Sequence, residues 1–157
     1  MPVIVIGADT TLGKSVIGEL RHHDRDIRAF VSDPAVAADL RNHGIKVALG
    51  DVSDGSHVGA AAAGCFSAIV IPEAALDDRL RSFANSPEAT ISTWASALDE
   101  ASISRLISFE DSRVPGVSKR FADLTVEIMV ILTEGRSPAD IAVEVARAAD
   151  LDSITEV

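Results

Sequence analysis

Short apolar runs alternate with segments of helical periodicity along most of this chain. The runs are four or five residues long and mostly apolar, which is typical of strands buried on both faces of a sheet. They lie at residues 3–6, 27–31, 45–49, 67–71 and 105–109. Between them, apolar residues recur every three or four positions, which indicates amphipathic helices. This alternation predicts a parallel sheet covered by helices on both faces.

Polar and glycine residues mark where several helices begin and end. Asp33, Ser86 and Ser137 each precede a proline, so each side chain is placed to cap a helix whose first residue is that proline. Gly44 is expected to end the first of these helices. The pattern places two further helices at about 11–22 and 56–63.

Two segments leave alternatives open. Residues 73–85 have no clear period and are expected to form either a loop or a frayed helix over the site. Residues 124–132 are long enough for a helix, but their density of β-branched side chains favours a sixth strand. Residues 1–157 are therefore expected to form a single doubly wound α/β Rossmann domain of about six strands, without a substrate lobe.

The composition narrows the class of protein. With 47% apolar and only 4% aromatic residues, the core must be mainly aliphatic, which suits such a sheet. The net charge of −10 disfavours nucleic acids and anionic membranes as partners. A single cysteine, Cys65, and the lack of a membrane-spanning run or signal peptide indicate a soluble cytoplasmic protein. None of the four histidines has the spacing of metal ligands.

The turn after the first strand carries the strongest ligand signal. It reads Gly7-Ala8-Asp9-Thr10-Thr11-Leu12-Gly13. Gly7 allows a tight turn off the strand, Gly13 lets the helix pack close to the sheet, and free amides at the helix start would bind a pyrophosphate. Asp33 follows Gly13 at the spacing of a ribose-binding acid, although it is equally suited to a plain helix cap.

Together with several other motifs, this turn resembles the atypical short-chain dehydrogenases, especially their NmrA-like branch. Residues 27–34 are similar to the family's second strand and the turn after it, and residues 47–54 to its Gly-Asp-aliphatic-x-Asp motif. Residues 104–107 are similar to the start of the fifth strand. The resemblance implies a site for NAD or NADP in which Asp51 and Val52 hold the adenine edge.

The predicted cofactor site extends along the carboxyl ends of the first four strands. It comprises Gly7, Thr10, Thr11, Leu12, Gly13, Ser32, Asp33, Asp51, Val52, Ile71 and Pro72. Ile71 and Pro72 would flank the ribose and nicotinamide.

Two positions in this site depart from the family pattern. Thr10 replaces the middle glycine of the turn, where its β-branched side chain would either crowd the pyrophosphate or donate its hydroxyl to a phosphate oxygen. Ser32 stands where family members that use NADP often carry an arginine. Ser32 and Asp33 therefore favour NAD over NADP, although Lys14 and Arg28 could partly replace the missing arginine.

The catalytic groups of the family are also missing. The chain contains no tyrosine, and Glu110 and Asp111 stand where the fifth strand of the family leads to the catalytic serine. A tyrosine with a neighbouring lysine transfers a proton because the cation lowers the pKa of the phenol. The standard Ser-Tyr-Lys mechanism is thus excluded. Glu110 is the only weak candidate for acid–base work, and a solvated loop acid is its more ordinary role.

Three functions remain open from the sequence. The leading hypothesis is a dinucleotide-binding redox sensor that lacks dehydrogenase activity, as some NmrA-like proteins do. The alternatives are a compact NAD(P)-dependent oxidoreductase with a non-standard acid or base, and a degenerate scaffold subunit that binds no nucleotide. Exposed helix surface left by the missing lobe suggests a homodimer or a partner protein.

Overall fold

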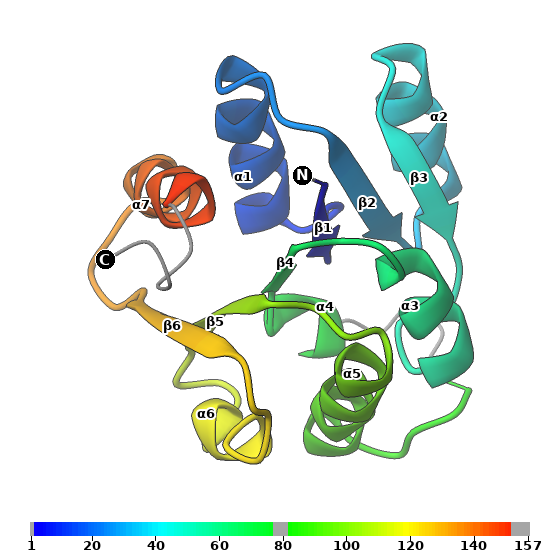
Figure 1. Ribbon diagram of the computed structural model, residues 1–157, viewed down its shortest axis with the longest axis vertical. Coiled ribbons are helices and arrows are strands. Elements are labelled where there is room, and N and C mark those ends of the chain that lie inside the picture. The colour runs from blue at the N-terminus through cyan, green and yellow to red at the C-terminus, as the bar shows by residue number, and fades with distance from the viewer. Residues whose placement is uncertain (1, 77–81, 152–157) are drawn as a thin grey trace.

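The computed structural model describes residues 2–76 and 82–151, which form one six-stranded sheet with helices on both faces (Figure 1). Neighbouring strands are all parallel, and their order is β3-β2-β1-β4-β5-β6. The strands are β1 Val3–Ile6, β2 Ile27–Val31, β3 Lys46–Leu49, β4 Ser67–Val70, β5 Arg105–Glu110 and β6 Glu127–Leu132. This order confirms the predicted doubly wound Rossmann sheet.

Two layers of helices cover the sheet and enclose two apolar cores. The helices are α1 Thr11–His22, α2 Pro34–Asn42, α3 Gly55–Ala62, α4 Glu73–Leu76, α5 Pro87–Glu100, α6 Val117–Arg120 and α7 Pro138–Asp150. On one face lie α1, α2 and α7, and on the other lie α3 and α5 with the two short helices (Figure 1). Strand side chains alternate between the cores, so that Val3 and Val5 pack in the first and Ile4 and Ile6 in the second.

The predicted helix caps are present. The side chains of Asp33, Ser86 and Ser137 each accept a backbone amide from the first helical turn, at 2.9, 3.1 and 3.1 Å respectively. Each proline stands where its missing N–H costs no hydrogen bond. The expected helix at 56–63 and the strands at 45–49 and 67–71 differ from the structure by one residue, because fraying at element ends leaves no local pattern.

The structure shows the secondary structure of most of the two segments, 73–85 and 124–132, that the sequence left open. The chain from 127 to 132 is strand β6, paired with β5 along its whole length, which confirms the preference for a strand. Residues 73–76 form the single turn α4, whereas 77–81 lie outside the described residues. Helix α6 was not predicted, because one turn is too short to show a period.

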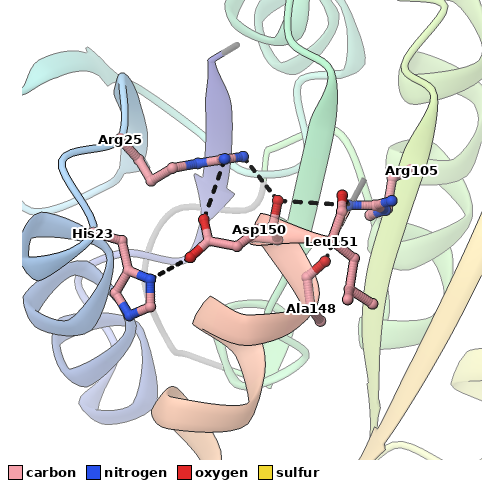
Figure 2. Close-up of polar contacts among 7 residues, drawn as sticks. His23, Arg25, Arg105, Ala148, Asp150 and Leu151 are labelled. Carbon is pink, nitrogen blue, oxygen red and sulfur yellow. Dashed lines mark hydrogen bonds and ion pairs between the residues drawn. The ribbon is translucent and has the colours of Figure 1, made fainter. Parts of the chain in front are cut away.

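The C-terminal end of α7 is held against the sheet by Arg105, Arg25 and His23 (Figure 2). The buried Arg105 guanidinium on β5 donates to the carbonyls of Ala148 at 3.1 Å and Leu151 at 2.6 Å. Arg25 and His23 both contact the Asp150 carboxylate. The two arginines complement the partial negative charge of the helix terminus. Because Arg105 is the first residue of β5, the end of α7 lies at the amino edge of the sheet, away from the carboxyl ends of the strands.

The strand order reverses between β1 and β4. Helix α1 leaves β1 toward one face, and α4 and α5 follow β4 on the other (Figure 1). The backbone on the two sides therefore separates beyond the carboxyl ends of β1 and β4, where ligands bind in doubly wound folds. The predicted site residues are found at this edge.

Candidate functional site

Both glycines of the first turn are required by their surroundings. Gly7 has φ +94°, and a Cβ there would lie 2.9 Å from the Ala74 Cβ and 3.2 Å from the Ile71 Cβ. A Cβ on Gly13 would lie 2.0 Å from the Gly7 carbonyl oxygen. The turn is thus packed tightly between α1 and the segment after β4, as a dinucleotide-binding turn needs.

Thr10 is the N-cap of α1 and uses its hydroxyl within the turn. Its Oγ1 donates to the Gly7 carbonyl at 2.7 Å and accepts the Gly13 amide at 2.9 Å. Since a hydroxyl has one proton, donation to a phosphate would break the bond to Gly7. Within residues 2–76 and 82–151, the amides of Thr11 and Leu12 form no hydrogen bond. These two amides at the helix start remain available to an anion.

The end of β2 is bound to the glycine turn through Asp9. The Asp9 Oδ2 accepts the amides of Ser32 at 2.8 Å and Asp33 at 3.1 Å, and Asp9 is only 9% exposed. The Ser32 hydroxyl donates to the Gly50 carbonyl at 3.0 Å. Sequence reasoning missed Asp9, although an acidic residue inside a phosphate-binding turn is itself an unusual feature.

Of the two basic residues that could have replaced an arginine at position 32, Arg28 is engaged elsewhere. The Arg28 guanidinium donates to the carbonyls of Ala61 and Ala63 at the end of α3, at 3.3 and 2.5 Å. The suggestion that Arg28 meets a 2′-phosphate is therefore wrong, because its side chain is turned toward the opposite edge of the sheet. Lys14 is exposed on α1, in the groove between α1 and α2.

Asp51 is a buried carboxylate whose two oxygens accept hydrogen bonds from Ser53 and Ser82. Its Oδ1 accepts the amide and hydroxyl of Ser53 at 2.8 and 2.6 Å, and its Oδ2 accepts the Ser82 amide at 2.7 Å. Burial raises the pKa of this carboxyl, but the bonds from Ser53 and Ser82 outweigh burial and hold the pKa below its ordinary value. The Val52 carbonyl accepts the indole N–H of Trp94 at 2.7 Å.

A cleft of about 830 Å³ opens beside the glycine turn. It brings Thr11 and Leu12 together with Ile71, Pro72 and Glu110. Ser32, Asp33, Asp51 and Val52 do not line it and belong to the neighbouring side of the sheet edge. The predicted residues therefore form two groups at the carboxyl edge of the sheet, one lining the cleft and one outside it.

Glu110 lies at the carboxyl end of β5, on the rim of this cleft. Its side chain is exposed and accepts a hydrogen bond from the Ser118 hydroxyl, and its main-chain carbonyl accepts the Thr133 hydroxyl at 2.6 Å. Sequence reasoning did not anticipate either hydroxyl, because Ser118 lies on the unpredicted helix α6 and Thr133 is 23 residues away in the chain. The Glu110 side chain is therefore exposed at the rim of the cleft.

Asp111 and Arg113 form an ion pair on the same rim. The Arg113 guanidinium donates to the two Asp111 oxygens at 3.0 and 2.7 Å. These bonds hold the pKa of Asp111 below its ordinary value and raise the pKa of Arg113. Both groups stay charged near neutral pH, so neither is suited to proton transfer.

Across residues 2–76 and 82–151, no three His, Cys, Asp or Glu side chains are grouped so that they could hold a metal ion. No helix in the same residues is both long and apolar enough to cross a membrane.

Comparison with known proteins defines the family. The sequence pattern of the NAD(P)H-binding family matches residues 7–152, and the chain belongs to this family. The expected resemblance to atypical short-chain dehydrogenases of the Rossmann type is confirmed. A search of curated proteins finds no match.

Solved structures show the same fold at low sequence identity. The anaerobillin reductase ChuY from Escherichia coli O157:H7 is 15% identical with a TM-score of 0.73; the match covers 98% of this chain and 93% of ChuY. The Citrobacter sp. triphenylmethane reductase in complex with NADP(H) is 15% identical with a TM-score of 0.77, covering 98% of this chain and 67% of the reductase. The NADPH-dependent quinone oxidoreductase QOR2 from Escherichia coli is 20% identical with a TM-score of 0.66, covering 82% of this chain and 47% of QOR2. At these identities the likeness shows the fold alone.

Proposed function

We propose that this chain binds a nicotinamide dinucleotide and senses its redox state, without turning over a substrate by the Ser-Tyr-Lys mechanism. The observation that carries the proposal is a tight turn between Gly7 and Gly13, neither of which has room for a Cβ, in a chain that contains no tyrosine. Membership of the NAD(P)H-binding family supports the ligand. The missing proton donor supports a role in binding rather than in catalysis.

The dinucleotide would lie along the carboxyl edge of the sheet. The amides of Thr11 and Leu12 would bind the pyrophosphate at the start of α1. The adenosine would extend past Ser32, Asp33, Asp51 and Val52, and the nicotinamide would enter the cleft beside Ile71 and Pro72. We propose NAD as the preferred form, because position 32 is a serine and Arg28 is engaged with α3.

Thermal unfolding with saturating NAD, NADH, NADP and NADPH tests the proposal. A ligand at about 100 times its dissociation constant stabilises the folded state by about 2.7 kcal/mol. For a chain of this size, the midpoint should rise by about 5–10 °C. The oxidised and reduced forms should give different shifts if the protein senses redox state. No shift with any of the four would contradict both this proposal and the enzymatic alternative, and would leave a scaffold subunit.

One observation favours an enzymatic alternative. The cleft beside the nicotinamide position has room for a small organic substrate, and Glu110 stands on its rim. The similar structures named above are reductases or an oxidoreductase. A compact oxidoreductase would transfer hydride by positioning the two reactants, with a proton from Glu110 or from water.

Cofactor oxidation with a panel of carbonyl and quinone compounds separates the two functions. Turnover that is lost in Glu110→Gln but kept in Glu134→Gln would establish the oxidoreductase. Glu134 is a suitable control because it is an exposed carboxylate in the same cleft. Nucleotide binding without turnover would support the sensor.

A further inference from the structure

Two successive backbone amides join the segment before α5 to the end of β3. The Ser82 amide donates to the Asp51 Oδ2 at 2.7 Å, and the Phe83 amide donates to the Ser53 Oγ at 3.0 Å. Asp51 and Ser53 are both buried. The backbone of residues 82–83 is therefore fixed beside the two residues that the proposed site assigns to the adenine edge, Asp51 and Val52.

Ser53 connects these contacts through one buried hydroxyl. The hydroxyl donates to the Asp51 Oδ1 at 2.6 Å and accepts the Phe83 amide. Its single proton and its acceptor site toward Phe83 are both used, so that the hydroxyl is held in one orientation. The position of the Phe83 backbone thus depends on the residues at the end of β3.

The Phe83 side chain lies in water although its backbone is anchored. Phe83 is 66% exposed, more than any other large apolar residue of segments 2–76 and 82–151. Because its nitrogen lies 3.0 Å from the Ser53 Oγ, its ring lies within one side-chain length of the end of β3. A scattered apolar side chain on a surface is ordinary, but an anchored backbone presents this ring at a fixed place, which lowers the entropy cost of binding a ligand.

The end of β3 also has hydrogen-bonding groups suited to the edge of a base. Within residues 2–76 and 82–151, the Val52 amide forms no hydrogen bond, although Val52 is only 3% exposed. Buried amides usually have a partner. This donor follows the Asp51 carboxylate, which is an acceptor, and a base presents both donors and acceptors on its edge. A base bound by its edge keeps its faces free for an aromatic ring.

We propose that Phe83 stacks on the adenine ring of the dinucleotide, and that Ser53 is the positioning residue that holds Phe83 for this contact. The inference rests on the proposed dinucleotide site and adds a binding residue from the segment before α5. Stacking on a base requires a planar ring and tolerates its exchange for another aromatic ring.

Calorimetric titration of the whole chain with 5′-AMP and NAD tests the contact. Phe83→Ala should weaken the binding of both ligands about tenfold, and by the same factor, because both contain adenine. The unliganded variant should unfold at the wild-type temperature, since an exposed side chain contributes little to stability. Leu151→Ala, which removes another exposed apolar side chain at the end of α7, is the control and should change neither affinity.

Phe83→Trp gives a second, spectroscopic measurement. It keeps a planar ring and should keep the affinity for 5′-AMP to within about threefold. The emission of the new indole should be quenched when 5′-AMP stacks on it. The wild-type protein supplies the background, because Trp94 is the one tryptophan of the chain and is buried.

The outcomes separate this inference from the proposed function. Equal binding of 5′-AMP by the wild type and Phe83→Ala overturns the inference and leaves the dinucleotide site in place. An indole in Phe83→Trp that 5′-AMP does not quench also overturns it, and this result is independent of whether Phe83→Ala folds. A wild-type protein that binds neither 5′-AMP nor NAD contradicts the dinucleotide site itself, and the inference fails with it.

Discussion

Thr10 shows how a single residue balances the stability of the turn against its capacity to bind. Its hydroxyl joins Gly7 to Gly13 and so closes the start of α1. The same bond occupies the Gly13 amide, one of the donors that a helix start offers to a phosphate. The threonine therefore stabilises the empty turn and reduces its anion site to fewer amides.

The variant Thr10→Gly should separate these two effects. The unliganded protein should lose only about a few tenths of a kcal/mol of unfolding free energy, because glycine is itself tolerated as an N-cap, and the released Gly13 amide should strengthen nucleotide binding. Urea unfolding and calorimetric titration with NADH measure the two quantities. Thr10→Ser keeps the hydroxyl and serves as the control. Weaker binding in Thr10→Gly would mean that the threonine supports the ligand.

Asp51 makes the free energy of unfolding depend on pH in the acid range. Its folded-state pKa is lowered by hydrogen bonds, so the ionised form stabilises the fold at pH values above the unfolded-state pKa of about 3.9. This contribution is lost as the pH falls through the lower folded-state pKa. The difference in unfolding free energy between wild type and Asp51→Asn should thus be constant near neutrality and shrink below about pH 4.

Denaturant unfolding between pH 7 and pH 3 measures this difference. Asp123→Asn, at an exposed position, is the matched control and should follow the wild-type curve. A wild-type advantage over Asp51→Asn that grows toward acid pH would contradict the assigned direction of the pKa.

At the scale of elements, Arg105 determines how the last helix attaches to the sheet. Its side chain is fully buried, pairs with Glu127 on β6 at 2.9 Å and donates to carbonyls at the end of α7 (Figure 2). The adjacent Phe66 ring lies 5.4 Å from its guanidinium carbon. One cation thus links β5, β6 and α7.

Arg105→Ala should destabilise the protein by about 3–5 kcal/mol, because it leaves Glu127 partly buried without its partner. Amide hydrogen exchange should increase first at the C-terminal turn of α7. Arg136→Ala is the control: it removes a more exposed ion pair with Glu144, which should contribute less than about 1 kcal/mol. Equal losses in the two variants would show that burial does not set the strength of the Arg105 contacts.

Most elements could be predicted because their signals are local. The caps at Asp33 and Ser86 are each indicated by a polar side chain and the proline after it. Strand β6 is indicated by a run of β-branched residues. The helix α6 was not predicted, because a single turn is too short to show a hydrophobic periodicity.

At the scale of the whole molecule, β6 is an outer strand of the sheet with exposed apolar side chains. Val130 is 43% exposed and Leu132 is 64% exposed. Such an edge favours association with another chain. We predict a homodimer, with twice the chain mass by light scattering. Val130→Lys should shift the protein toward monomer, whereas Leu151→Lys, at an exposed apolar residue on the end of α7, should not. A monomeric wild-type protein would contradict this prediction.

The sequence by itself determined the Rossmann fold, the two glycines of the turn and the absence of a tyrosine proton donor. These depend on backbone freedom, periodicity and residue identity, all of which are visible locally. The roles of the predicted site residues in binding a nucleotide stay predictions.

Only the tertiary structure decided which polar groups of the site are engaged within the chain. Asp9 meets the end of β2, Arg28 meets α3, and Asp51 meets Ser82, across separations of more than twenty residues. A local pattern shows that a side chain can form a hydrogen bond but not which distant partner it finds. That choice is made when the strands are placed side by side, and here it determines how much of the site remains open to a ligand.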